Sequence, residues 1–190
     1  MNFVTLNTEQ QRVYNLYKSN APHLGKPCFH DFIADELRAG RALEDEWDVD
    51  AKIMDSIIKM GGTQEKIELF RATFDDFVAP FISLGIYRYP TFMSTSTDDF
   101  SIQKHWADAF GRIPALLKIT CPPGTPMIDG ELNVSHGGHE AEIILGRCST
   151  FRVISVTEIT DLNQIYQLMG GYYSRGKKML KVYELEFLKT

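Results

Sequence analysis

The segment Glu140-Ala-Glu-Ile-Ile-Leu-Gly146 places two glutamates at alternate positions, ahead of three large aliphatic residues. The aliphatic run predicts a strand over Glu140–Leu145. Because residues two apart on a strand point to the same side, the carboxylates of Glu140 and Glu142 are expected to share one face. Like charges on one face repel each other and destabilise a strand. The pair therefore indicates either a solvated edge strand or two carboxylates with separate chemical tasks.

An arginine stands within an earlier apolar run, Ile67-Glu-Leu-Phe-Arg-Ala-Thr73. A period of two places Arg71 on the same face as Ile67 and Leu69, which is the inward face if the strand is half buried. An arginine in such a place must be paired or must bind an anion. Arg71 is therefore interpreted either as half of an ion pair at the strand end or as a bidentate clamp on a phosphate.

Three hydroxyl residues, Ser94-Thr95-Ser96, end a strand predicted over Thr91–Ser96. Serine and threonine are common where a strand runs into a helix cap. A helix is expected from about Asp99 to Phe110, with Asp98 as its cap. Capping is therefore one interpretation of the hydroxyl run, and a row of hydroxyls that lines a cleft is the other.

Helical patterns come before strand patterns along the chain. A capping-box pattern at Thr8 and Gln11 begins the first expected helix, and Phe29–Ala39 forms a second. An apolar stripe that stops at Gly61-Gly62 indicates a third. The remaining predicted strands are Lys66–Thr73, Ala115–Thr120, Thr150–Thr157 and Met179–Leu188. Helices followed by strands favour the α+β class.

The composition fits one domain over residues 1–190, mainly helical in 1–62 and mainly strand in 63–190. Hydrophobic residues make up 44% and charged residues 24%, as is usual for a globular protein. The formal net charge of −5 disfavours nucleic acid as the main partner, because phosphate binding needs a basic patch. The three cysteines are odd in number and widely spaced, so they indicate no disulfide framework.

The sequence contains no stretch with the apolar length of a membrane span, and its start lacks the basic-then-apolar pattern of a signal peptide. We therefore expect a monomer without membrane contact. Its expected location is the cytoplasm, or outside the cell after export by a route that leaves no cleaved signal.

Of two common nucleotide-binding motifs, one is incomplete in this sequence and the other is missing. Gly171-Tyr-Tyr-Ser-Arg-Gly-Lys177 matches most of a phosphate-binding loop, but Lys178 stands where a serine or threonine should bind magnesium. A strand, not the required helix, is expected after it. The sequence also lacks a Gly-x-Gly-x-x-Gly pattern, so a Rossmann dinucleotide site is unsupported.

Two sets of residues suggest metal ligands without the spacing of a known metal motif. The first set is His136, His139 and Glu142, and the second is His23, Cys28 and His30. Gly137-Gly138 disfavours a helix that would bring the first set onto one face. We interpret both sets as polar loop residues and a buried thiol, and expect no metal.

In their order along the chain, the arginine strand, the Ser-Thr-Ser run and the Glu-x-Glu strand resemble the mono-ADP-ribosyltransferases of the R-S-E class. Phe92-Met-Ser-Thr-Ser96 looks like the second block of that family. Glu140-Ala-Glu-Ile-Ile-Leu-Gly146 followed by Phe151-Arg-Val153 looks like the third. His30-Asp-Phe-Ile-Ala-Asp-Glu-Leu-Arg-Ala-Gly40 is similar to its helical N-terminal half, so the resemblance covers almost the whole chain.

The resemblance implies a reaction and a set of roles. NAD would be the substrate, and ADP-ribose would pass to a side chain of a target protein. Glu142 would bind the ribose and stabilise its positive charge, Ser94 would orient Glu142, and Arg71 would hold the diphosphate. Glu140 would take a proton from the acceptor, which resembles the arginine-modifying members, although a serine or threonine hydroxyl acceptor also needs a base.

The resemblance also implies a wider NAD-binding set and a fold. The set is Arg71, Ala72, Ser94, Thr95, Ser96, Trp106, Phe110 and Arg112. Trp106 or Phe110 would stack on nicotinamide, although their helical spacing also suits core packing. The implied fold has two small packed sheets that form an NAD cleft, with helices from the N-terminal part along one side.

Two departures separate the chain from the family pattern. Ala72 stands where glycine usually follows the arginine, and the loop Ser135-His-Gly-Gly-His139 lacks the usual aromatic residue. The absence of paired cysteines makes the chain look more like a bacterial effector or toxin than like the vertebrate members. Two alternatives are an NAD glycohydrolase toxin, in which water is the acceptor, and a catalytically dead module that binds NAD or protein.

Overall fold

The computed structural model describes residues 5–107, 111–132 and 141–188. The chain divides into two compact units, each built from three separate stretches. The first unit contains Met1–Thr63, Tyr89–Ser94 and Pro126–Ser149, and the second contains Gln64–Arg88, Thr95–Thr125 and Thr150–Thr190. The single catalytic domain expected from the sequence stays a prediction.

Three α-helices belong to the first unit: α1 (Thr8–Lys18), α2 (Phe29–Arg38) and α3 (Asp45–Met60). Helix α1 begins with a capping box in which Asn7 accepts from the Gln10 backbone N–H at 2.9 Å and the Gln10 side chain accepts from the Asn7 N–H at 3.1 Å. The box lies one residue earlier than predicted, because asparagine caps a helix at least as well as threonine.

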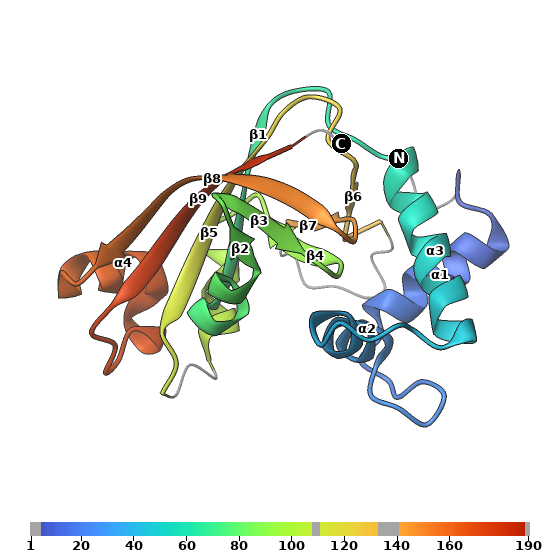
Figure 1. The fold of residues 1–190 in the computed structure, drawn as a ribbon, viewed down its shortest axis with the longest axis horizontal. Helices are drawn as coiled ribbons and strands as arrows, with labels where there is room; N and C mark the ends of the chain where they lie inside the picture. Colours follow the sequence, from blue (N-terminus) through green and yellow to red (C-terminus); the bar gives the residue numbers. More distant parts are fainter. Residues whose placement is uncertain (1–4, 108–110, 133–140, 189–190) are drawn as a thin grey trace. The chain divides into compact units, whose positions relative to one another are not determined.

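The three helices lie close together (Figure 1). They contribute residues to one apolar core. Trp47 of α3 stacks on Phe29 of α2, with ring centroids 5.7 Å apart. Phe92, Ile128 and Ile144 join this core from segments on or beside the strands β4 (Met93–Ser96), β6 (Met127–Asp129) and β7 (Glu142–Leu145). Helices and strands of the first unit therefore share a single hydrophobic contact region.

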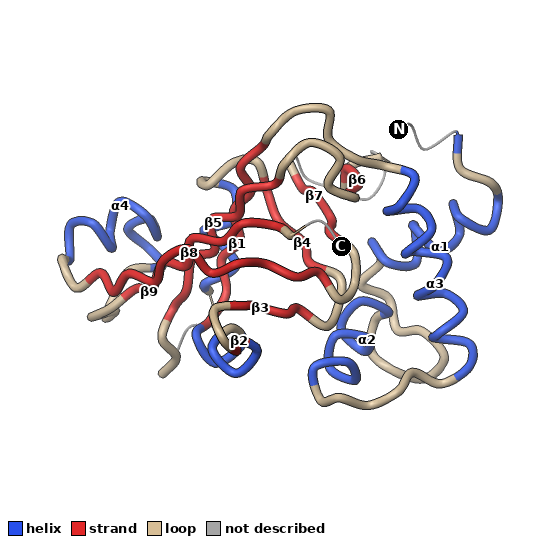
Figure 2. The backbone as a smooth tube through the Cα atoms, turned by 45° about the horizontal axis from the view of Figure 1, so that its top comes forward, coloured by secondary structure: helices blue, strands red, loops and turns tan. Residues whose placement is uncertain are grey.

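Six strands follow one another by hydrogen bonding in the order β2 (Ile82–Ser83), β3 (Ile86–Tyr89), β8 (Ser149–Ile159), β9 (Leu180–Phe187), β5 (Pro114–Cys121) and β1 (Ile67–Phe74) (Figure 2). β1 and β5 are antiparallel over their full length, and β5 and β9 are parallel. The short helices η2 (Asp75–Phe77) and η3 (Ala79–Phe81) connect β1 to β2.

The second unit has its own core on one side of β1, β5 and β9. Helix η4 (Ser101–Trp106) and helix α4 (Leu162–Tyr173) pack there. The buried members are Ala72, Phe74, Ile102, Trp106, Leu116, Ile165, Met169, Leu180 and Val182. The indole N–H of Trp106 donates to the Thr73 and Ala115 carbonyls at 3.1 and 3.3 Å, which satisfies the one polar atom of this side chain.

The α+β class is confirmed, but the strands do not form two separate sheets. Strand β4 pairs with β1 through Ser96↔Phe70 and is also the neighbour of β7, so one order of nine strands runs β2-β3-β8-β9-β5-β1-β4-β7-β6. The expected division into two sheets is wrong because β4 is hydrogen-bonded to β1 on one side and to β7 on the other.

Several predicted elements differ from the structure. The helix expected over 99–110 is the shorter 3₁₀ helix η4 within the described residues. Helix α4 occupies a region predicted without a helix, and it covers the start of the loop-like Gly171–Lys177 motif. Asp161 caps α4 by accepting from the Gln164 N–H, while Gly170, with a φ of 74°, kinks it near its end. The two adjacent glycines obscured its periodicity.

An ion pair at the end of β7 supplies a test of what stabilises the first unit. Arg147 donates from Nε to Asp55 of α3 at 3.1 Å, and its guanidinium lies 5.6 Å from the Phe92 ring centre. Both charged side chains are mostly buried, at 15% and 24% exposure. This pair therefore joins α3, β7 and the segment before β4.

We expect Arg147→Met to lower the free energy of unfolding by about 2 kcal/mol, because it leaves the Asp55 carboxylate without its charged partner. Urea denaturation followed by circular dichroism measures this. The matched control is Arg152→Met, because Arg152 pairs with Glu186 in an exposed bridge and such bridges contribute less than about 1 kcal/mol. Equal effects of the two substitutions on the free energy of unfolding would contradict the stabilising role given to the Arg147–Asp55 pair.

Candidate active site

Two residues predicted to act together are in contact in the first unit. The Ser94 hydroxyl, on β4, donates a hydrogen bond to Oε1 of Glu142, the first residue of β7. They are 48 residues apart in sequence, and the adjacency of β4 and β7 brings them together. Glu142 is only 8% exposed. A carboxylate buried to this extent requires hydrogen-bond or charged partners.

The second partner of Glu142 is Lys18, which the sequence analysis missed. Lys18 lies in the last turn of α1, and its Nζ contacts Oε2 of Glu142. The lysine side chain is also largely buried, at 16% exposure. A lysine in a last helical turn is common because it suits the helix dipole. No local signal in the sequence distinguishes this one, which is 124 residues from Glu142.

Gly130 makes room for the Glu142 carboxylate. Its N–H donates to the Glu142 carbonyl at 2.8 Å. A Cβ at position 130 would lie 2.2 Å from Oε2 of Glu142, well inside van der Waals contact. The absence of a side chain at this position therefore allows the carboxylate to lie where Ser94 and Lys18 contact it. The sequence analysis did not single out this glycine.

The segment between β6 and β7 is held near both of its described ends. The Tyr14 hydroxyl accepts from the Leu132 N–H at 3.0 Å, and the Glu131 carboxylate accepts from the Ala141 N–H at 2.9 Å. Glu140, His136, His139 and the Ser135–His139 loop lie outside the described residues. The structure therefore fixes where this segment leaves β6 and where it enters β7.

The predicted strand Glu140–Leu145 is corrected at its start. β7 begins at Glu142, and Ala141 has a φ of 49°. The alternation that places residues two apart on the same face holds only for extended backbone. The left-handed backbone at Ala141 therefore removes the argument that strand geometry aligns the carboxylates of Glu140 and Glu142.

Arg71 lies in the middle of β1 in the second unit, opposite Leu117 of β5. It shares its strand face with Leu69, as the period of two predicts. The other face, with Phe70, Ala72 and Phe74, packs into the second core. Ala72 is 7% exposed there. Arg71 thus projects from the side of β1 opposite the second core, a side on which Leu69 is also fully buried.

The remaining predicted NAD-binding residues are also in the second unit. Trp106 is 1% exposed, which favours its core-packing role. Ser96 accepts from the Asp98 N–H at 2.9 Å, and Thr95 is buried beside it. The predicted cap at Asp98 is wrong, because η4 has Phe100 at its N-cap and no side-chain cap bond. Arg112 pairs with Asp76 at 3.3 Å and lies 4.6 Å from the ring centre of Phe77. Phe110 lies outside the described residues.

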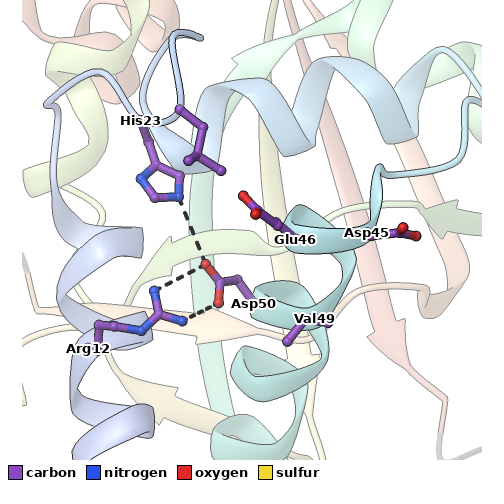
Figure 3. A pocket seen from close by; sticks show the side chains of 7 residues that line it. Arg12, His23, Asp45, Glu46, Val49 and Asp50 are labelled. Atoms are coloured by element: carbon purple, nitrogen blue, oxygen red, sulfur yellow. Dashed lines mark hydrogen bonds and ion pairs between the residues drawn. The ribbon is translucent and has the colours of Figure 1, made fainter.

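A separate cavity of about 370 Å³ opens between α1 and α3 (Figure 3). Its lining is Arg12, His23, Leu24, Asp45, Glu46, Val49 and Asp50. Arg12 and Asp50 pair across it, and His23 lies 4.0 Å from the same carboxylate. The proposed catalytic and NAD-binding residues do not line this cavity, and the buried Asp50 carboxylate in it is paired with Arg12.

No helix in the described parts of the chain combines the length and apolar character needed to cross a membrane.

Known structures share this fold. An ADP-ribosyltransferase toxin from Paenibacillus larvae, Plx2a, is 15% identical with a TM-score of 0.66, and the match covers 98% of this chain and 89% of Plx2a. C3larvin toxin, an ADP-ribosyltransferase from the same organism, is 13% identical with a TM-score of 0.62 and 98% coverage of both chains.

The ADP-ribosylating toxin BECa of a C. perfringens binary enterotoxin, determined with NADH, is 15% identical with a TM-score of 0.67. The match covers 98% of this chain but 45% of BECa, so the present chain corresponds to less than half of that protein. No curated protein sequence matches this chain.

At these identities the structures establish the fold, and a family model gives the assignment. The model described as ADP-ribosyltransferase exoenzyme matches residues 33–188, which is most of the chain. The matched range includes β1, β4 and β7, and so it contains Arg71, Ser94 and Glu142. The chain therefore belongs to the ADP-ribosyltransferase exoenzyme family and is an NAD-dependent mono-ADP-ribosyltransferase.

Proposed function

We propose that this enzyme is of the R-S-E class and transfers ADP-ribose from NAD to an arginine side chain of a target protein, releasing nicotinamide. The observation that carries the proposal is the hydrogen bond from Ser94 to Glu142. It joins the hydroxyl run and the glutamate strand, the second and third of the three blocks. A dead binding module has no need to hold a buried carboxylate in this way, so the contact favours catalysis.

Glu142 is the proposed stabiliser of the transition state. Cleavage of the bond between nicotinamide and ribose develops positive charge on the ribose ring, as in glycoside hydrolysis. A carboxylate held in a poorly hydrated place interacts strongly with that charge and needs little reorganisation. Ser94 occupies one oxygen of Glu142 and so limits rotation of the carboxylate. Gly130 leaves the space that this orientation requires.

Arg71 is the proposed ligand of the NAD diphosphate. Its planar guanidinium presents several N–H donors, which match two phosphate oxygens at once. Arg71 lies on the side of β1 opposite the second core, beside the buried Leu69 and opposite Leu117, where a guanidinium needs hydrogen-bonding or anionic partners. Ala72, by contrast, contributes its methyl group to that core and is not assigned a contact with NAD.

Glu140 is the proposed base for the acceptor. An arginine side chain has a pKa above about 12 and arrives protonated, so attack on the ribose requires loss of a proton. A carboxylate two residues before Glu142 in sequence has the chemistry to accept it. The target is proposed to be a host protein, with the enzyme acting as an exported effector. A serine or threonine acceptor would need the same base.

We expect Glu142→Gln to abolish transfer to protein and slow NAD hydrolysis alike, by at least about a thousandfold, because the loss of charge stabilisation amounts to several kcal/mol. Radiolabelled NAD with a host-cell lysate measures transfer, and released ADP-ribose measures hydrolysis. The control Glu184→Gln removes an exposed carboxylate on β9. Near-normal activity of folded Glu142→Gln would remove this residue from the mechanism.

Glu140→Gln separates transfer from hydrolysis. Glutamine keeps the shape of the side chain but cannot take a proton, so labelling of protein should collapse while release of free ADP-ribose persists. The two activities are followed in one reaction by separating protein-bound from soluble label. Parallel loss of both would show that Glu140 helps to bind NAD, and surviving transfer would show that the base lies elsewhere.

Gly130→Ala tests the space around Glu142 without changing a charge. The added methyl would overlap Oε2 and displace the carboxylate, so kcat should fall at least about tenfold, which corresponds to 1.4 kcal/mol of barrier. The matched control is Gly146→Ala at the other end of β7, where a Cβ would meet Ile58 at an ordinary 3.6 Å. Steady-state kinetics with NAD and thermal unfolding of both variants distinguish displacement from misfolding. Equal activity of the two variants would contradict the role assigned to Gly130.

A further inference from the structure

A cluster of three metal-binding side chains lies at the start of α2, and the proposed reaction does not use it. Cys28 Sγ is 3.4 Å from His30 Nε2 and 3.1 Å from Asp31 Oδ2. His30 Nε2 is 3.6 Å from Asp31 Oδ1. Within the described residues this is the one group of at least three such side chains whose ligand atoms all lie within 4.8 Å of one another.

These separations fit a single tetrahedral ion. Zinc binds thiolate sulfur at about 2.3 Å and imidazole nitrogen or carboxylate oxygen at about 2.0 Å, which places ligand atoms about 3.3 to 3.6 Å apart at tetrahedral angles. The Cys28–His30 separation of 3.4 Å lies in that range. Asp31 presents Oδ2 to the sulfur at 3.1 Å and Oδ1 to the nitrogen at 3.6 Å, so its carboxylate must turn for one oxygen to serve as the ligand. Small side-chain rotations are enough to complete the geometry.

The orientation of His30 is a second, independent observation. Its Nδ1 is 3.0 Å from the carbonyl oxygen of Tyr17, a residue of the apolar core. A proton on Nδ1 that donates to this carbonyl leaves a lone pair on Nε2, the nitrogen that faces Cys28. Metal-binding histidines are generally held in this way by a backbone carbonyl or carboxylate, which fixes both tautomer and ring orientation.

Charge and access also suit a divalent cation. Once a bound metal displaces the proton of the Cys28 thiol, the thiolate and the carboxylate together supply two negative charges, which exceed the partial positive charge at the N-terminus of a helix. Cys28 is buried at 7% exposure, while the Asp31 side chain is 66% exposed and gives a route from solvent. His23, grouped with Cys28 and His30 in the sequence analysis, lies instead against Trp47 and Asp50.

The geometry points to a zinc-binding site formed by Cys28, His30 and Asp31, with the fourth coordination position open to solvent. Mixed sulfur, nitrogen and oxygen ligands in tetrahedral arrangement favour zinc over magnesium or calcium. Metal binding at this site does not depend on the proposed transfer reaction. It departs from the expectation of no metal, which rested on spacing without Asp31. Because His30 is hydrogen-bonded to the carbonyl of Tyr17, the ion would also stabilise the end of α1, where Lys18 contacts Glu142.

The test is a titration of the full, reduced, metal-free chain with Co²⁺, which takes zinc sites and reports its ligands by absorption. We expect thiolate-to-cobalt charge-transfer absorption together with the visible bands of tetrahedral Co²⁺, saturating at one ion per chain and removed by added Zn²⁺. Cys28→Ser and His30→Gln should weaken binding at least tenfold. Cys148→Ser, which removes an exposed cysteine elsewhere, should bind like the original chain.

Thermal unfolding with and without Zn²⁺ provides a readout that does not depend on cobalt or on activity. Zinc should raise the Tm of the original chain and of Cys148→Ser, and leave that of Cys28→Ser unchanged, because a ligand stabilises only the state that binds it. Metal-free Cys28→Ser should unfold at the same temperature as the metal-free original, which shows that it folds. No charge-transfer absorption in the original chain, or equal absorption in Cys28→Ser, would overturn the proposal.

Discussion

The buried carboxylate of Glu142 is the constraint on which the rest of the first unit depends. A charged group removed from water destabilises a fold unless other groups pair with it and hydrogen-bond to it. The chain supplies these partners from Ser94 on β4 and Lys18 on α1, two elements far from β7 in sequence. Both contacts require the helix end and the two strands to lie within hydrogen-bonding distance of one carboxylate. The packing that holds α1 in place is therefore part of the site.

Strand β7 is fixed at three places along its short length. Its first residue accepts a backbone hydrogen bond from Gly130. Ile144, fully buried, packs in the same core as Tyr14 and Tyr17 of α1. Just beyond its end, Arg147 pairs with Asp55 of α3. Because interiors are packed closely, a strand held at its start, middle and end cannot slide without loss of all three contacts. Glu142 thus inherits a fixed position from residues that carry no catalytic function.

The sequence predicted what depends on local pattern and missed what depends on contacts between distant residues. Strands β1, β5 and β9 were recognised within one or two residues at each end, because apolar runs of that length are distinctive. The same-face argument for Glu140 and Glu142 lost its basis because Ala141 adopts a positive φ, which alanine seldom does and composition does not reveal.

The candidate site was likewise predicted only in part. The contact between Ser94 and Glu142 was anticipated through the order of the three blocks, since periodicity within either strand does not relate the two. Lys18 was missed because a lysine in a last helical turn has an adequate local explanation. Gly130 was missed because its importance lies in the space needed by a side chain elsewhere.

Lys18 also explains how the carboxylate that we propose to be catalytic can stay buried before substrate binds. In the proposed mechanism, Glu142 must present negative charge to the ribose, yet in the unliganded protein that charge needs a partner. The ammonium of Lys18 supplies one at Oε2, while Ser94 holds Oε1. A positive charge on the same carboxylate would weaken its attraction for the oxocarbenium ion. Binding of the ribose therefore requires Lys18 to withdraw or to share Oε2, and the flexible four-carbon stem of lysine permits this more readily than a rigid guanidinium would. The lysine stabilises the folded resting state, and its displacement would leave Glu142 with the charge that bond cleavage needs.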